Sequence, residues 1–449
     1  MNYLDTNDNI VALATADGLA SVSIVRISGR RLGKLYTLIS KKKTLPRANS
    51  IYFNKIHSPK TKEHLDDGLI AYFKNAASFT GESVLEVNCH GGNYVASHLI
   101  NDIVESGAAR HALPGEFSFR AFYNGKIDLL QAESINDLIH AETDVYVKKS
   151  LDNVSGELSK TINSIKNAVL NVISLVEHEL DFNPDEIVFT NTKDLLKQLL
   201  SINVNLEKIE SSFLHSKMIR NGIRVLLLGR ANVGKSSLFN YLMGEQRAIV
   251  SNVRGTTRDA IESVFEIGGY RVSLVDSAGM LKSKDSLEKM AVEKTKNEIE
   301  LANIIIWLSD DFLNLNEYDR LLKNKSVIKV LTKADIIKHS GLLKNTLKIS
   351  SKTGQNIPEL LTMLSTEIKF LTQRKNRAGE FLINKRHYAL IKKSKIQIER
   401  AIDGLSSGMT HDILADILHE FLFTFNNIST PVGRKDIINN IFSSFCVGK

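Results

Sequence analysis

The sequence predicts a multidomain protein of mixed α/β and α+β class, in which an α/β domain is inserted into a helical domain that follows an N-terminal α+β domain. Short stretches near the N-terminus, such as Val22 to Ile27 and Val84 to Val87, alternate like strands between turn residues. Apolar residues recur at helical spacing both before and after the middle of the chain. Between these helical segments, the apolar run Ile223 to Leu228 leads into a glycine-rich loop and a new helical pattern, as a buried parallel strand does.

Length, charge and cysteine content narrow the class of protein. A chain of 449 residues is long enough for about three domains. Its two cysteines, Cys89 and Cys446, lack the spacing of a metal site or a disulfide framework. The first residues do not read as a signal peptide, and no run of eighteen apolar residues occurs. We therefore expect a cytoplasmic protein without stable membrane insertion.

The net charge of +8 favours an anionic partner such as nucleic acid or a membrane surface. Much of the basic clustering lies in three short runs, Arg374 to Arg377, Lys385 to Arg386 and Lys392 to Lys395. A solvated helix face explains such runs about as well as RNA binding does.

The helical domain is predicted from a stripe of apolar residues between Leu151 and Leu180, typical of one long amphipathic helix that ends near Asn183 and Pro184. The helical pattern resumes in Tyr388 to Leu405 and Ile413 to Phe425. Packing within a bundle is the favoured use of the stripe, and a two-stranded coiled coil is the alternative. The expected domain limits are 1–120 for the N-terminal domain, 121–214 and 373–449 for the two parts of the helical domain, and 215–372 for the inserted domain.

The loop after the central strand carries the phosphate-binding pattern G-x-x-x-x-G-K-[ST] between Gly229 and Ser237. Its glycines let backbone N–H groups converge on a β-phosphate at a helix N-terminus. Lys235 supplies a cation for the β- and γ-phosphates, and the Ser236 hydroxyl is placed to ligate Mg²⁺. A chance match in a glycine-rich turn is the alternative, which the flanking strand and helix disfavour.

Three further motifs follow apolar strands in the order expected of a Ras-like P-loop GTPase. Asp276 can hold Mg²⁺ through water, and the N–H of Gly279 can sense the γ-phosphate. The segment Thr332 to Asp335 resembles the NKxD guanine-reading signature, with Thr in place of the common Asn, and the Asp335 carboxylate can accept from both donors on the guanine edge. Ser350 to Lys352 resembles the loop that supports the base. Together the motifs predict an enzyme that binds and hydrolyses GTP with Mg²⁺.

The polar stretch Ser251 to Asp259 is typical of a switch segment. Thr257 is the candidate for a second hydroxyl on Mg²⁺, ordered while the γ-phosphate is present. Its Gly-Thr-Thr-Arg-Asp sequence resembles a subclass of GTPases that use K⁺ where others use an arginine finger, and Asn232 matches the asparagine that helps ligate this ion. A monovalent cation there neutralises charge that builds up in the transition state. A loop-capping side chain is the alternative for Asn232.

Motifs outside this region point to one family. They are Ile10 to Thr15, Val25 to Gly29, Pro114 to Ser118, Arg120 to Phe122, Asn124 to Leu129, Gln131 to Glu133 and Phe445 to Lys449. With them the chain resembles the tRNA modification GTPase MnmE family, also called TrmE, from end to end. The resemblance implies an N-terminal domain that binds tetrahydrofolate and dimerises, a central helical domain, and an inserted GTPase domain.

The resemblance also implies a reaction and a partner. Members act with the flavoprotein MnmG (GidA) and build 5-carboxymethylaminomethyl or aminomethyl groups on the wobble uridine of certain tRNAs. The carbon comes from 5,10-methylene-tetrahydrofolate, or a 5-formyl derivative occupies the site. Carried over by motif, Arg26, Glu86, Lys126 and Lys449 bind the folate. Lys and Arg suit its glutamyl carboxylates and a Glu suits the amidine-like edge of the pterin, although Glu86 and Lys126 also fit an ordinary surface pair.

The resemblance further supplies the residues expected in catalysis and nucleotide binding. Met280 stands where Ras-type enzymes carry a water-positioning Gln, and the water-orienting Glu of the family falls on Glu288. The expected catalytic residues are Glu288, Lys235 and Thr257. The expected GTP contacts are Asn232, Val233, Gly234, Lys235, Ser236, Ser237, Ser251, Thr256, Thr257, Asp276, Ser277, Ala278, Gly279, Thr332, Lys333, Asp335, Ser350, Ser351 and Lys352. The expected metal ligands are Ser236 and Thr257 for Mg²⁺, and Asn232, Ser251, Val253 and Thr256 for K⁺.

Two other classes share parts of these patterns. A ribosome-assembly GTPase that binds rRNA would have the same GTPase domain and basic character, but should add a KH-type G-x-x-G module or a second GTPase domain. A membrane-remodelling GTPase could use the long helix as an assembly arm, but needs an amphipathic, aromatic-rich anchor. We find neither signature in the sequence.

Overall fold

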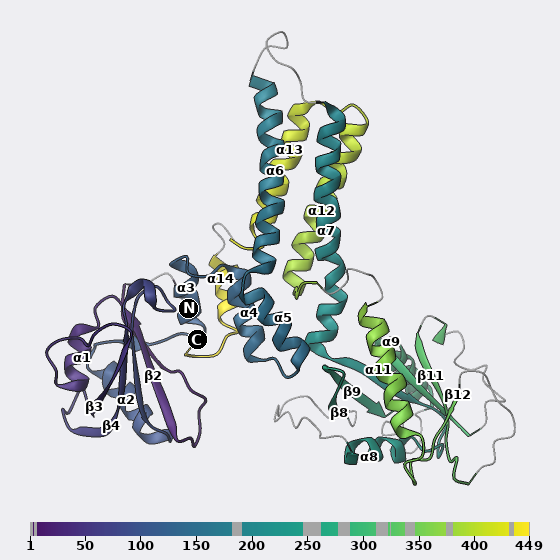
Figure 1. The fold of residues 1–449 in the computed structure, drawn as a ribbon, viewed down its shortest axis with the longest axis horizontal. Coiled ribbons are helices and arrows are strands. Elements are labelled where there is room, and N and C mark those ends of the chain that lie inside the picture. Colours follow the sequence, from purple (N-terminus) through teal and green to yellow (C-terminus); the bar gives the residue numbers. More distant parts are fainter. Residues whose placement is uncertain are drawn as a thin grey trace. The chain divides into compact units, whose positions relative to one another are not determined.

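The computed structural model describes residues 3, 7–181, 191–245, 262–276, 288–310, 322–323, 325–336, 346–373, 380–430 and 435–448. The chain divides into two compact units. The first comprises Met1–Asn136, Asp152–Thr192 and Asp403–Lys449, and the second Asp137–Leu151 and Lys193–Ile402. Each unit contains one sheet and part of the helical segments, which agrees with the predicted mixed multidomain class (Figure 1). The domain limits expected from the sequence stay a prediction.

The first unit contains a six-stranded sheet of order β3-β4-β5-β2-β1-β6. Its strands are β1 Ile10–Leu13, β2 Val22–Gly29, β3 Ser50–His57, β4 His64–Phe73, β5 Ser83–His90 and β6 Arg110–His111. The neighbours are antiparallel except β1 and β6. Helices α1 (Gly33–Ser40) and α2 (Asn93–Glu105) pack on the face that carries Val25, Ile27 and Val87. Because side chains alternate along a strand, Arg26 and Glu86 lie on the opposite face.

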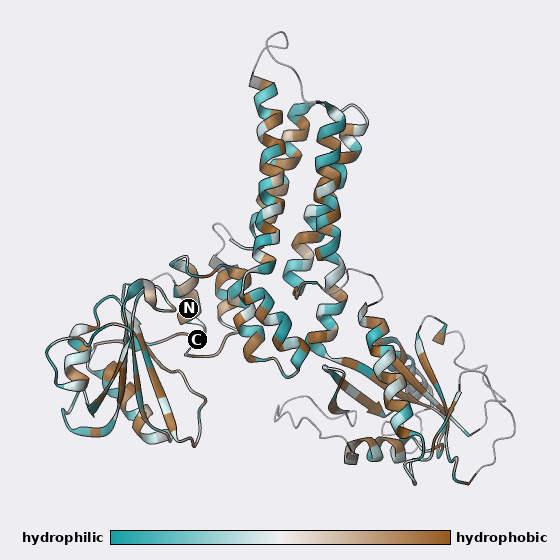
Figure 2. Ribbon diagram, in the orientation of Figure 1, coloured by the Kyte–Doolittle hydropathy of each residue, from teal (hydrophilic) through white to brown (hydrophobic). Residues whose placement is uncertain are grey.

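The remaining helices of the first unit bury their apolar stripes against one another. They are the short turn η1 Asn75–Ala77 and the helices α3 Glu116–Tyr123, α4 Leu129–Ile139, α6 Glu157–Asp181, α13 His411–Asn426 and α14 Lys435–Phe442. The apolar stripe of α6, including Leu158, Val169 and Val176, is buried, and α6 packs alongside α13. Figure 2 shows apolar and polar residues alternating as stripes along these helices.

The single long helix predicted from Leu151 to Leu180 is wrong in its first part. The chain forms two helices, α5 Asp144–Val154 and α6, and Leu151 is half exposed. The helical path breaks at Gly156, whose φ of 89° lies in the left-handed region that interrupts a right-handed helix. The apolar period continues across this break, so spacing alone could not reveal it.

The second unit contains a six-stranded sheet of order β12-β11-β10-β7-β9-β8, in which only β8 is antiparallel to its neighbour. Its strands are β7 Ile223–Leu228, β8 Glu262–Ile267, β9 Tyr270–Asp276, β10 Ile304–Ser309, β11 Ser326–Leu331 and β12 Thr346–Lys348. The helices of this unit are α7 Thr192–Asn221, α8 Lys235–Glu245, α9 Glu288–Leu301, α11 Ile357–Gln373 and α12 Lys385–Ser406. Strand β7 contributes Val225 and Leu227 to one core and Leu226 and Leu228 to another, so both faces of the sheet are covered.

The C-terminal segment is held in the first unit by an aromatic cluster. Phe442 and Phe445 are buried with Tyr3, Phe119 and Leu129, and the Gly115 N–H donates to the carbonyl of Cys446 at 3.1 Å. Phe442 and Phe445 therefore anchor the tail in a packed core, while Cys446 and Val447 are exposed. Among the described helices, none combines the length and the hydropathy needed to cross a bilayer.

Candidate functional site

The predicted nucleotide-binding segments lie together at the carboxyl edge of the parallel sheet. Leu227 of β7 pairs in register with Asp276 at the end of β9. On the other side of β7, the Thr332 N–H donates to the carbonyl of Ser309 at 2.9 Å, directly after β11 and β10 end. Open parallel sheets bind ligands at this edge, where the loops after the strands converge.

The phosphate loop joins β7 to α8 and is closely packed at its base. A Cβ atom on Gly229 would lie 2.5 Å from the carbonyl oxygen of Leu308, so only glycine fits. Asn232 has a φ of 62°, a left-handed conformation that Asn adopts more readily than most residues. The Lys235 ammonium donates to the carbonyls of Gly229 at 2.8 Å and Arg230 at 2.7 Å. Burial lowers the pKa of Lys235, partly offset by the Asp276 carboxylate.

The predicted magnesium ligand Ser236 and Asp276, predicted to hold the ion through water, lie together beside this lysine. The Ser236 hydroxyl donates to Oδ2 of Asp276 at 2.9 Å, and Asp276 is almost fully buried. A hydroxyl and a carboxylate oxygen are the donors that Mg²⁺ prefers. The geometry therefore suits a small hard cation between the phosphate loop and the end of β9.

The base-reading segment is tied to the phosphate loop through its unusual threonine. The Thr332 hydroxyl donates to the carbonyl of Val233 at 2.7 Å, in a buried position. The Ala334 N–H donates to the Ile349 carbonyl at 3.0 Å, which places the Asp335 segment next to the Ser350 loop. Asp335 is exposed, and Ser350 is fully buried and accepts from the N–H of Thr353 at 3.3 Å. The Thr332 to Asp335 and Ser350 to Lys352 motifs, which are separate in the sequence, therefore lie side by side in the fold.

Part of the predicted nucleotide site lies outside the described residues. This holds for Ser251, Val253, Thr256, Thr257, Ser277, Ala278 and Gly279. Glu288 begins α9, but its side chain also lies outside the described set. Asn232 is exposed, and its side chain makes no hydrogen bond with another described residue. The proposed roles of the switch residues and of Glu288 stay predictions.

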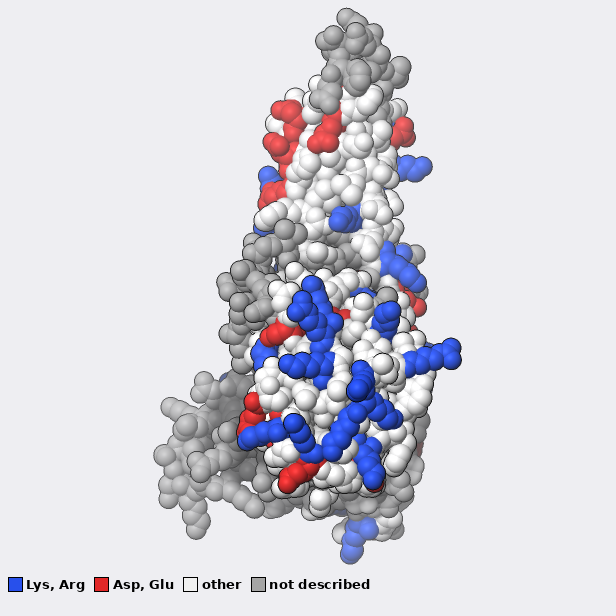
Figure 3. Space-filling view, turned by 90° about the vertical axis from the view of Figure 1, so that its left-hand side faces the viewer, with Lys and Arg blue, Asp and Glu red and all other residues white. Residues whose placement is uncertain are grey.

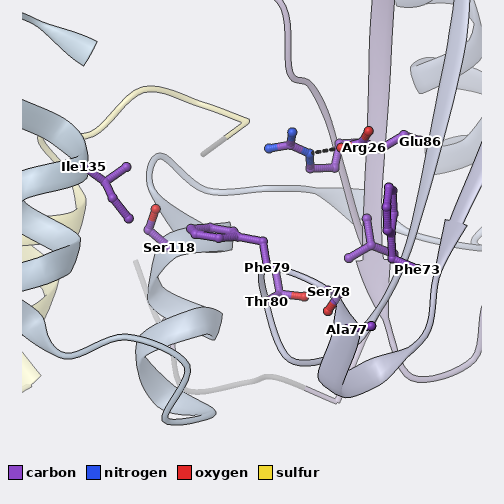
Figure 4. Close-up of a pocket in the computed structure, with 10 residues that line it drawn as sticks. Arg26, Phe73, Ala77, Ser78, Phe79, Thr80, Glu86, Ser118 and Ile135 are labelled. Carbon is purple, nitrogen blue, oxygen red and sulfur yellow. Dashed lines mark hydrogen bonds and ion pairs between the residues drawn. The ribbon is translucent and has the colours of Figure 1, made fainter. Parts of the chain in front are cut away.

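A second candidate site is a pocket of about 440 Å³ in the first unit (Figure 4). Its walls are Arg26, Phe73, Ala77, Ser78, Phe79, Thr80, Val84, Glu86, Ser118 and Ile135. Arg26 and Glu86 are cross-strand partners in register on β2 and β5, and Arg26 Nε donates to Glu86 Oε1 at 2.8 Å. Arg26 also lies 5.9 Å above the ring centroid of Phe117 and donates through Nη1 to the Gly448 carbonyl at 3.2 Å.

The other two predicted folate residues relate differently to this pocket. Lys126 is exposed and is not one of the residues that line it. Its Cγ would lie 3.2 Å from a Cβ on Gly81, directly after the pocket residue Thr80. Lys449 lies outside the described residues, but its neighbour Gly448 reaches Arg26. The pocket thus contains Arg26 and Glu86 in its wall, while the C-terminal segment reaches it only through the bond from Arg26 to Gly448, and Lys126 lies near Thr80.

Sequence reasoning missed most of the pocket walls. Phe73 ends β4, and Phe79 lies in the connection before β5. No local pattern marks these two aromatics as pocket residues, because the pocket between them forms only in the folded domain. Ser118 could have been predicted as a site residue, since it belongs to the Pro114 to Ser118 motif.

Arg120 and Glu116, which belong to the motifs near the pocket, have a structural role. Arg120 is fully buried, and its Nη atoms lie 3.0 Å from Glu82 Oε2 and 3.0 Å from Glu116 Oε1. Arg110 adds a 2.7 Å contact to Glu116. Burial lowers the pKa of Arg120, but the carboxylates of Glu82 and Glu116 outweigh it, and the net direction is upward. Because a buried charge is costly without such partners, this network fixes α3 against the sheet and so places Ser118 at the pocket.

A phosphate loop, a magnesium-type donor pair and a guanine-reading segment at one sheet edge define a P-loop GTPase, here joined to an α+β domain with its own pocket. The family model described as "MnmE helical domain" matches residues 129–446, and the model described as "GTP-binding protein TrmE N-terminus" matches residues 9–126. The chain belongs to the tRNA modification GTPase MnmE family, and it is a GTP hydrolase.

Similar proteins extend over almost the whole chain. A protein of Fervidobacterium nodosum named tRNA modification GTPase MnmE is 36% identical over 462 residues, which are 98% of this chain and 98% of the relative. A protein of the same name from Flavobacterium johnsoniae is 33% identical over 468 residues, covering 98% of this chain and 99% of the relative. The solved G domain of the T. maritima FeoB iron transporter is 29% identical and covers 32% of this chain and 98% of that domain, with a TM-score of 0.26.

Proposed function

We propose that this chain is a potassium-dependent GTPase that acts with the flavoprotein MnmG (GidA) to modify the wobble uridine of certain tRNAs. The products are 5-carboxymethylaminomethyl or aminomethyl derivatives. The observation that carries the proposal is the presence, in one chain, of a GTPase site and a separate pocket on the N-terminal sheet. The name and full-length coverage of the relatives support it.

The pocket suits a tetrahydrofolate, which when bound supplies the one-carbon unit. Its volume of about 440 Å³ falls in the range of small-molecule sites. Phe73 and Phe79 offer apolar walls to a flat pterin, and Glu86 offers a carboxylate to its amidine-like edge. Arg26, Lys126 and Lys449 would supply positive charge for the glutamyl carboxylates. In this arrangement Arg26 holds the Glu86 carboxylate in a fixed orientation, through the 2.8 Å contact between them.

Each predicted residue of the GTPase site has a separate role in GTP hydrolysis. Lys235 would neutralise the β- and γ-phosphates, while Ser236 and Thr257 would ligate Mg²⁺ and Asp276 would hold it through water. Asn232, Ser251, Val253 and Thr256 would hold K⁺, which balances charge that develops in the transition state. Glu288 orients the attacking water, a role left open by Met280 at the usual glutamine position. The hydrogen bond from Thr332 to the Val233 carbonyl holds the base-reading segment next to the phosphate loop.

The N-terminal sheet also supports a homodimer. Strand β3 is an edge strand, and Ile51 and Phe53 on it are 62% and 67% exposed. Phe53 pairs in register with Leu69, which is 45% exposed on the same face. Exposed apolar residues on an edge strand favour pairing with another chain. We propose a second copy of this chain as that partner, in the cytoplasm.

The test of the proposed function is mass spectrometry of wobble uridines from cells that lack this protein. We expect the 5-carboxymethylaminomethyl and aminomethyl groups to disappear and to return with the wild-type gene. The variant Lys235→Ala should fail to restore them, because it removes a cation from the phosphates. Unchanged uridine modification in the deletion strain would contradict the proposal.

A further inference from the structure

The first unit carries a dense run of positive charge that the nucleotide site and the pocket do not use. Residues 30–62 contain ten Lys and Arg and neither Asp nor Glu, so this segment alone exceeds the net charge of +8 of the chain. Seven of these cations lie on α1 or beside its ends and are exposed: Arg30, Arg31, Lys34, Lys41, Lys42, Lys43 and Arg47. We call these seven residues the α1 basic surface.

The fold gathers these cations instead of spreading them along the chain. Leu45 packs at the start of α1, 3.9 Å from where a Cβ on Gly33 would lie. The chain after α1 therefore runs back along the helix and brings Arg47 towards Arg31 and Lys34. A helix of eight residues is about 12 Å long, so the cations at its two ends cover a surface of that extent. Figure 3 shows Lys and Arg side chains gathered over this end of the N-terminal domain.

The charges of the surface are not balanced locally. Among the described residues, none of its seven side chains forms an ion pair, whereas nearby Lys60 is paired with Glu105. In the basic run at Lys392 to Lys395, which stands out in the sequence, Lys395 differs in this respect. Lys395 lies 3.0 Å from Glu210 and 3.7 Å from Glu399, so part of its charge is already neutralised. The α1 basic surface is thus the stronger candidate for an external anion.

The chemistry of the surface favours an RNA backbone over a membrane. The apolar residues of α1, including Leu35, Tyr36 and Ile39, are buried in the sheet core. None of the exposed large apolar side chains among the described residues lies between residues 30 and 49. Membrane-surface helices need such side chains to enter the lipid. A polyanion needs only cations at a spacing that several phosphates can reach.

We propose that the α1 basic surface binds the phosphate backbone of the tRNA substrate. This inference rests on the proposed function, since it assigns a docking surface to the tRNA named there. The surface reads charge and not sequence, because backbone contacts position a nucleic acid without specifying its bases. It therefore supplies affinity, and the choice of tRNA lies elsewhere.

The test compares two triple variants of the full chain that remove equal charge. Lys34→Gln, Lys42→Gln and Lys43→Gln change the α1 basic surface; Lys385→Gln, Lys392→Gln and Lys393→Gln change exposed lysines of α12. Gln keeps most of the side-chain length and nearly the same helix propensity. Binding of unmodified tRNA is measured by fluorescence anisotropy across a salt series, and binding to anionic lipid vesicles is measured alongside. Thermal unfolding and GTP hydrolysis report that both variants remain folded.

We expect the first variant to lose at least tenfold in tRNA affinity at low salt. The slope of log affinity against log salt should also flatten by up to about 3, since each phosphate contact contributes about 0.9. The second variant should stay within about twofold of the wild type. Equal loss in both variants would show a non-specific charge effect and overturn the proposal. So would binding of the first variant at wild-type strength, or loss of binding to anionic vesicles without loss of tRNA binding.

The proposed function and this inference can fail separately. If wobble uridines remain modified in cells without the protein, the function fails whatever the binding data. If modification depends on the protein and the α1 variant still binds tRNA like the wild type, only the docking surface is wrong.

Discussion

The phosphate loop and the pocket of the N-terminal sheet are built in opposite ways. The loop depends on neighbours in the sequence, because the Lys235 ammonium donates to the carbonyl of Arg230, five residues away. The pocket depends on distant partners, because Arg26 contacts Glu86 and also Gly448, 422 residues further along the chain. A local loop keeps its geometry while the strand and helix around it persist. The pocket residue Arg26 is held by the last segment of the chain, so a change in the tail should disturb the pocket and spare the loop.

Deleting residues 445–449 tests this contrast most severely. We expect binding of a tetrahydrofolate derivative, measured by equilibrium dialysis, to fall below detection. The deletion removes Lys449, the Gly448 carbonyl and the Phe445 ring that anchors the tail. GTP hydrolysis should remain largely intact, because the phosphate loop has its own core.

Loss of Phe445 could also loosen the aromatic cluster, so a milder variant is needed. Lys449→Ala keeps Phe445 and should still weaken folate binding at least tenfold, by removing one cation from the glutamyl carboxylates. If this variant and the deletion both bind folate like the wild type, the tail has no part in the pocket and the contrast between the two sites disappears.

A change at Glu288 tests the nucleotide site by itself. Glu288→Ala should lower kcat for GTP hydrolysis by about a hundredfold while leaving GTP affinity nearly unchanged, since a water-orienting group acts mainly in the transition state. Glu300→Ala, an exposed glutamate at the other end of α9, is the matched control and should be silent. Parallel loss of affinity and rate would indicate a structural role for Glu288. Folate binding should not respond to either change.

Potassium provides the next test. Replacing K⁺ by Na⁺ should slow GTP hydrolysis at least tenfold, because a well-fitted cation stabilises the transition state by more than about 1.4 kcal/mol. Asn232→Ala should hydrolyse GTP equally slowly in both salts. A wild-type rate that is the same in the two salts would exclude a potassium site at Asn232.

The smallest expected effect concerns the two cysteines. Cys446 is exposed in the tail, whereas burial raises the pKa of the Cys89 thiol to about 11. At pH 8 a thiol with this pKa is ionised in about one molecule in a thousand, so a thiol reagent should modify Cys446 and spare Cys89. A bound tetrahydrofolate derivative should slow labelling of Cys446 severalfold, and GTP should not. Protection by GTP alone would link the tail to the nucleotide and not to the pocket.

Several features could be predicted from the sequence because short-range geometry determines them. The phosphate loop needs a glycine at position 229 and a lysine at position 235, and both lie within one turn between a strand and a helix. The mixed class of the fold and the GTPase identity followed from the same local patterns. The break of the long helix at Gly156 was missed, because the apolar period continues across it.

Tertiary structure alone decided which distant residues became neighbours. The fold brought Phe73 and Phe79 into one pocket with Ser118 and Ile135, and the folded tail brought Gly448 to Arg26. It also decided which charges are available: Lys395 meets Glu210 across two helices, while the chain after α1 folds back and leaves Lys34, Lys42 and Lys43 facing solvent. A sequence states the charge of each residue, but ion pairing depends on distance, and distance between remote segments is fixed only when the cores pack.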